Sequence, residues 1–162
     1  MKNLVLISIF CCITTLGVEK APFRYIQGEA FHILPKTHSE ESGYFSLCEG
    51  NDGRIFIGTS KYNHNAYLVE FDPITEKQRI VVDAHKVCGL NAKGYAAQAK
   101  FHTRNFVGPS GVIYLGTKQG YAKKGDESEY PGGFLITYDP RNDTARNLGM
   151  PYKKQGIADV VA

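Results

Sequence analysis

Apolar residues along this chain come in short runs that alternate with polar residues, and most runs end near glycine, aspartate or proline. This pattern predicts short β-strands joined by turns. The predicted strands form two sets in the same order: 44–48, 54–59, 67–73 and 77–83, then 102–107, 112–117, 134–140 and 144–148. No segment after residue 17 shows a helical period of apolar positions. The chain is therefore predicted to be all-β.

The two sets of strands share much of their sequence. Residues 50–59 read GNDGRIFIGT and residues 108–117 read GPSGVIYLGT, so the glycines recur after 58 positions. Residues 67–73, YLVEFDP, are echoed by residues 134–140, FLITYDP. The glycine-containing tetrapeptides predict turns. Asp-Pro is expected to end the third strand of each set, because proline cannot donate a ladder hydrogen bond.

Four antiparallel strands per repeat are typical of a β-propeller blade. The phrases G-x-I-Y-x-G-T and Y-D-P resemble those of secreted β-propellers of the quinoprotein/YVTN/SMP-30-like type, from about residue 44 to the C-terminus. The chain has no Trp, which argues against a standard WD40 array. The expected fold class is thus all-β, with β-propeller blades that are four-stranded antiparallel sheets in an incomplete ring.

This interpretation divides the chain into six segments. They are a signal peptide (1–17), an N-terminal lead-in (18–43), a first blade (44–83), an inter-blade connector (84–101), a second blade (102–149) and the start of a third blade (150–162), whose first strand is predicted at 157–161. Propellers close with about 4–8 blades. Further blades are therefore expected from a longer chain or from an oligomer; the alternative is a sandwich of the two sheets.

Open blade faces have a consequence for exposure. Side chains built to meet a neighbouring blade are expected to remain partly exposed when that blade is missing. The residues concerned are Phe56, Ile113, Tyr114 and Val160.

The N-terminus has the form of a secretory signal. Lys2 precedes the apolar run 4–17, LVLISIFCCITTLG, which is short for a membrane span. The expected localisation is secreted or periplasmic. Cys11 and Cys12 leave a lipoprotein signal as an alternative, and an uncleaved anchor is another.

Charge and cysteine content exclude some partners. The net charge is +3 and the basic residues are scattered, so no nucleic-acid partner is expected. Cleavage of the signal would leave Cys48 and Cys88, which can form a disulfide in an oxidising compartment or remain buried free thiols. Their spacing does not suggest a zinc site, and no metal ligands are assigned.

The strongest candidate site lies at the start of the strand predicted at 102–107. Gln98, His102 and Arg104 are expected to bind a ligand, because the innermost strand of a propeller blade lines the central channel. Alternation along a strand places residues 102 and 104 on one side. Arginine would supply a fork for a carboxylate, and histidine a neutral ligand or proton donor. The expected partner is a sugar or an anionic small molecule; the alternative is a polar strand start bonded within the protein.

Other polar groups are weaker candidates. His64 and His85 are expected to be solvated loop residues, and the acidic loop 126–129 to be neutralised by neighbouring lysines rather than to hold calcium. Tyr121 and Tyr130 could stack on a sugar ring or pin the long loop that joins two strands of the second set.

Three functions follow from this interpretation. The first is a non-catalytic secreted propeller that serves as a ligand- or protein-binding platform, possibly for carbohydrate. The second is a propeller enzyme, a polysaccharide lyase or lactone hydrolase, with its other catalytic residues on missing blades. The third is an extracytoplasmic sensor propeller. Catalytic residues and a cofactor cannot be assigned, because the sequence has no nucleophile elbow, phosphate loop, dinucleotide fingerprint or HExxH motif.

Overall fold

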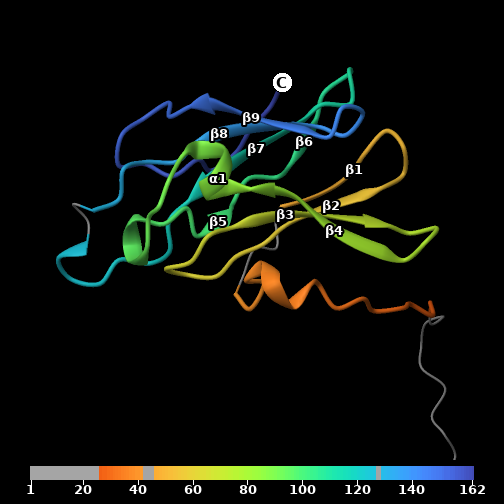
Figure 1. Cartoon of the computed structure of the whole chain (residues 1–162), viewed down its shortest axis with the longest axis horizontal. Coiled ribbons are helices and arrows are strands. Elements are labelled where there is room, and N and C mark those ends of the chain that lie inside the picture. Colours follow the sequence, from red (N-terminus) through yellow and green to blue (C-terminus); the bar gives the residue numbers. More distant parts are fainter. Residues whose placement is uncertain (1–25, 42–45, 127–128) are drawn as a thin grey trace, which may run out of the picture. The chain divides into compact units, whose positions relative to one another are not determined.

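A computed structural model describes residues 26–41, 46–126 and 129–162 (Figure 1). The chain divides into two units, residues 1–30 and residues 31–162. Residues 26–30 of the smaller unit carry no helix or strand. The predicted signal peptide at 1–17 lies outside the described residues. Within the described ranges, no helix is long and apolar enough to cross a membrane.

The larger unit contains two antiparallel sheets, which confirms the all-β prediction. The first sheet has the strand order β1-β2-β3-β4 and is drawn from yellow to green in Figure 1. Its strands are β1 (Leu47–Glu49), β2 (Ile55–Gly58), β3 (Tyr67–Asp72) and β4 (Lys77–Asp83). Each strand falls within or beside the segment that the sequence pattern predicted.

The second sheet repeats this order with one difference. Its strands are β5 (Lys100–Phe101), β6 (Phe106–Val107), β7 (Ile113–Lys118), β8 (Leu135–Asp139) and β9 (Thr144–Gly149). The order is β5-β7-β8-β9, and β6 pairs with the other end of β7. The single strand predicted at 102–107 is therefore replaced by two short strands with a break at residues 102–105. Lys100 also forms a bridge with Ser60, which links this sheet to the end of β2.

Helical structure occurs where the sequence pattern predicted none. The helix α1 (Ala84–Cys88) follows β4, and two 3-10 turns, η1 (Pro35–Thr37) and η2 (Gly94–Ala96), lie in loops. Asp83 caps α1, since its side chain accepts a hydrogen bond from the Lys86 backbone N–H. Gly89 ends the helix with φ of 67°, a left-handed angle that favours glycine. A helix of five residues is too short to reveal a helical period, so the sequence pattern missed it.

The repeated glycines make the same turn before β2 and before β7. The Gly50 N–H donates to the Arg54 carbonyl over 2.8 Å, and the Gly108 N–H donates to the Val112 carbonyl over the same distance. The third residue after each has positive φ: 79° at Gly53 and 82° at Gly111. These positions take glycine because a side chain disfavours such angles.

The repeated threonines make the same clamp at the end of β2 and in β7. The Thr59 N–H donates to the Tyr67 carbonyl, and the Tyr67 N–H donates back to the Thr59 Oγ1 at 2.9 Å. Thr117 and Phe134 exchange the same two bonds, with the return bond at 2.8 Å. The Gly-Thr pair of the repeat therefore fixes where the second and third strands meet.

One hydrophobic core is shared by the two sheets. Phe56 and Leu68 come from the first sheet, and Ile113 and Tyr138 from the second; all four are buried. The rings of Phe56 and Tyr138 lie 5.8 Å apart, between β2 and β8. The prediction that Phe56 and Ile113 are partly exposed was wrong, because each sheet covers the other at this face.

For the other two residues, Tyr114 and Val160, partial exposure was also predicted, and both are half-buried as expected.

Cys48 and Cys88 are free and half-buried rather than joined in a disulfide, and burial raises the pKa of both thiols to about 12. Both thiols are therefore protonated at neutral pH and act as small apolar groups.

Candidate functional site

The break at residues 102–105 is held against β7 by one side chain and one backbone group. The His102 N–H donates to the Gly116 carbonyl over 3.0 Å. The Gly116 N–H donates to the Thr103 Oγ1 over 2.9 Å, so a threonine hydroxyl replaces the carbonyl of a regular ladder. Thr103 is fully buried. The backbone is thus fixed here, although it leaves the strand conformation.

His102 and Arg104 line one shallow hollow of about 190 Å³ with Ala158 and Asp159. The C-terminal segment reaches this place because the Ile157 N–H donates to the Thr117 carbonyl over 3.1 Å. The structure therefore brings together two of the three residues that the sequence singled out. Asp159 was not foreseen, because only the tertiary contact at Ile157 brings it near.

His102 is held in its neutral form. Burial lowers the pKa of its imidazole, and the positive charges of Lys118 and Lys100 lower it further. A neutral imidazole can donate at one nitrogen and accept at the other. The group is suited to hydrogen bonding with a sugar hydroxyl rather than to carrying charge at neutral pH.

Two lysines lie on the paired strands β5 and β7. Lys100 lies directly opposite Lys118 in the pairing of β5 with β7. The Lys100 Nζ lies 4.9 Å from the ring centroid of Tyr62 and 5.5 Å from that of Tyr121. Lys100 is 5% exposed, whereas Tyr121 is 78% exposed. An aromatic face beside a buried cation suits a ligand with both an apolar ring face and negative charge.

Sequence reasoning named Tyr121 but missed Lys100 and Tyr62. Nothing in their spacing signals the cluster, because Tyr62 follows β2 and Tyr121 follows β7. The rings of the two tyrosines meet edge to face with centroids 5.0 Å apart. The cluster therefore depends on the Ser60–Lys100 bridge, which the strand pattern does not reveal.

Gln98 does not line the hollow. It is fully buried, and its amide nitrogen donates to the Gly132 carbonyl over 3.0 Å. Its Oε1 accepts from the Thr117 hydroxyl at 2.6 Å and from the Tyr130 hydroxyl at 3.3 Å. Gln98 therefore holds the long loop against β7. Tyr130 is buried in the same place, and burial raises its pKa.

The weaker candidates are engaged within the protein. The His85 Nε2 accepts from the Gln98 N–H over 3.0 Å, so His85 is not a solvated loop residue. His64 lies against His38, with ring centroids 4.9 Å apart. The Asp126 carboxylate accepts from the Lys123 N–H. Residues 127 and 128 of the acidic loop lie outside the described residues. In the described part of the chain, no group of three or more His, Cys, Asp or Glu residues is placed to hold a metal ion.

The chemical groups of this arrangement can bind a polar or anionic ligand. Arg104 supplies a guanidinium and His102 a neutral imidazole at the hollow. The ammonium groups of Lys100 and Lys118 belong to the paired strands β5 and β7, and the exposed ring of Tyr121 follows β7. No protein-family model, no curated protein and no solved structure matches this chain.

Proposed function

We propose that this chain forms two blades of a secreted β-propeller-type platform that binds an acidic carbohydrate. The repeated four-stranded order and the face-to-face packing of successive sheets support the blade assignment. The N-terminal run of the sequence supports export. The main support for the ligand class is the hollow lined by His102 and Arg104. A second support is the Lys100 ammonium, which lies 5.5 Å from the ring centroid of the exposed Tyr121.

The proposed binding mode follows from this geometry. Arg104 forms a two-pronged contact with a carboxylate of the ligand. His102, in its neutral form, bonds to a ring hydroxyl. Tyr121 stacks on an apolar sugar face near Lys100. Gln98 positions the loop and makes no ligand contact.

The test is binding of an oligogalacturonate, measured by isothermal titration calorimetry. We expect binding that weakens as salt is added, and no binding of a neutral glucan oligomer of the same length. Arg104→Ala should weaken binding about tenfold or more, because a hydrogen-bonded charge contributes about 1.5–3 kcal/mol. Tyr121→Ala should weaken it by removing the stacking face.

Arg141→Ala is the matched control. Arg141 is exposed and pairs with Asp139 in a turn between β8 and β9. Its loss changes the net charge by the same amount as the loss of Arg104. If Arg141→Ala and Arg104→Ala weaken binding equally, only the net charge matters and the proposed site is wrong. If neither acidic nor neutral oligosaccharides bind, the ligand class is wrong.

A further inference from the structure

The two sheets have the same strand pairing, so each residue on one face of the first sheet has an equivalent position in the second sheet. In the first sheet Arg79 lies opposite Glu70, and in the second sheet Arg146 lies opposite Thr137 at the same register. Both sheets also carry a register shift at the same place, after Leu68 and after Leu135. The two faces can therefore be compared residue by residue.

The second sheet covers this face of the first sheet. Arg79 donates to Glu70 in its own sheet and reaches across to Asp143, with an Nη1–Oδ1 distance of 2.8 Å. It also donates to the Tyr138 hydroxyl over 3.1 Å. Phe56 is fully buried beneath the same contact. An arginine, an acidic turn residue and an aromatic pair thus join the two sheets.

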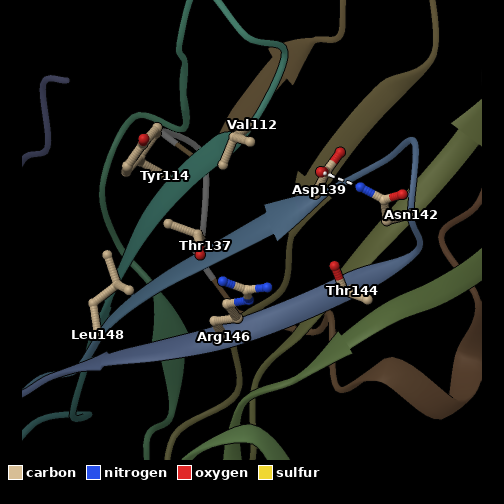
Figure 2. Close-up of a pocket in the computed structure, with 8 residues that line it drawn as sticks. All are labelled: Val112, Tyr114, Thr137, Asp139, Asn142, Thr144, Arg146 and Leu148. Atoms are coloured by element: carbon tan, nitrogen blue, oxygen red, sulfur yellow. Dashed lines mark hydrogen bonds between the residues drawn. The ribbon is translucent and has the colours of Figure 1, made fainter.

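The equivalent face of the second sheet is a hollow of about 380 Å³ (Figure 2). Arg146 stands in the place of Arg79, and Tyr114 in the place of Phe56. Figure 2 shows both side chains on the same side of the sheet as Val112, Thr137 and Leu148. Leu148 is 54% exposed. Among the described residues of the larger unit, no segment covers this face as the second sheet covers the first.

In the described part of the chain, the opposite face of the first sheet has residues that fit this hollow. In the contact between the sheets, the second sheet supplies Asp143 and Tyr138. The first sheet has Glu76 in the same turn position as Asp143, with φ of 57° against 50°, and Phe71 in the place of Tyr138. Glu76 is exposed. The opposite face of the first sheet could therefore repeat the contact that the second sheet makes.

We propose that a second copy of this chain docks onto the hollow around Arg146. The copy uses the face of its first sheet that carries Phe71, together with Glu76 in the turn between β3 and β4. The new ion pair joins Arg146 of one copy to Glu76 of the next. Because two different faces meet, the contact is head-to-tail and adds further copies until the rotation closes a ring. This proposal rests on the platform function and adds that other copies of this chain supply the neighbouring blades.

The segment 31–41 controls this assembly, because it lies over the face that must dock. Phe31 packs on Phe71, with ring centroids 4.7 Å apart. Gln78 donates to the His32 carbonyl over 2.9 Å and accepts from the Leu34 N–H over 3.1 Å. The second sheet has Ala145 in the place of Gln78, and the face that carries Ala145 packs against the shared core instead. Release of residues 31–34 therefore precedes docking.

The test is the concentration dependence of molar mass, measured by size-exclusion chromatography with light scattering. We expect the mass of the purified protein to rise with concentration. Gln78→Ala should shift this rise to a concentration about threefold to tenfold lower, because it removes both bonds to the covering segment. Arg146→Glu and Glu76→Arg should each weaken association about tenfold or more. The double variant should restore it.

Lys153→Glu is the charge-matched control, because Lys153 is exposed and lies outside both faces. A protein that stays monomeric at every concentration overturns the proposal. So does association that Arg146→Glu leaves unchanged, or a double variant that fails to associate, because these results place the interface elsewhere. Oligogalacturonate binding by the monomeric variants is measured in parallel. Loss of assembly with binding intact separates failure of this proposal from failure of the platform function.

Discussion

Gly58 sets how closely neighbouring segments approach the first sheet. A Cβ added at Gly58 would lie 2.0 Å from the Ser46 Oγ and 2.7 Å from the Phe101 Cβ. We expect Gly58→Ala to lower the free energy of unfolding by about 1–3 kcal/mol, because both neighbours must move. Urea denaturation measures this change.

Gly28→Ala provides the comparison. A Cβ added at Gly28 meets no atom within 4 Å, and its φ is not in the positive range. This substitution should change the free energy of unfolding by less than about 0.5 kcal/mol. Equal effects of Gly28→Ala and Gly58→Ala would show that the close approach at Gly58 is relaxed in solution.

The helix α1 makes stability depend on pH through His85. Burial lowers the pKa of His85, although Asp83 partly opposes this, and its Nε2 must be unprotonated to accept from the Gln98 N–H. The unfolded chain takes up a proton near pH 6.5, before the folded chain does. The contribution of His85 is therefore complete above about pH 6.5 and declines as the pH falls below it.

We expect His85→Gln to flatten this decline when unfolding is measured in urea between about pH 7.5 and about pH 5, the range where histidine titrates. The flattening should be partial, because the pKa of His102 is lowered in the same direction. Lys86→Gln, on the same helix, is the control and should keep the slope of the original protein. An unchanged slope in His85→Gln would contradict the assignment.

The strands were predictable where local sequence decides them. The glycine turns and Asp-Pro ends bound β2, β3, β7 and β8, and each lies within a residue or two of its predicted range. The break at 102–105 was not predictable, since it depends on a bond between Thr103 and Gly116. The same holds for α1, whose cap at Asp83 outweighs the absence of a helical period.

The candidate site was predictable only in part. His102 and Arg104 share a hollow, as alternation along the chain suggested, although the backbone there is not a regular strand. Gln98 belongs to the interior because its amide fits the carbonyl of Gly132 and two hydroxyls. A sequence shows that such a group is polar, but not whether a partner inside the protein satisfies it.

The shared core predicts that the two sheets unfold together. Phe56 belongs to the first sheet, but its ring packs on Tyr138 of the second. We expect Phe56→Ala to lower the free energy of unfolding by about 3–5 kcal/mol. Hydrogen exchange should become faster in both sheets. Leu47→Ala is the control, since Leu47 is 58% exposed and should have little effect. Faster exchange confined to the first sheet would contradict a single cooperative unit.

Ile157 has a role in the second sheet that matches the role of Phe101 in the first. The Phe101 N–H donates to the Thr59 carbonyl, and the Ile157 N–H donates to the Thr117 carbonyl. Phe101 also backs onto Gly58, as Ile157 backs onto Gly116. The segment that completes its own packing therefore ends at β5, whereas the repeat in the sequence ends at β4. A recombinant fragment that ends after β4 would lack Phe101, which packs against Gly58, whereas a fragment that ends after β5 would retain it.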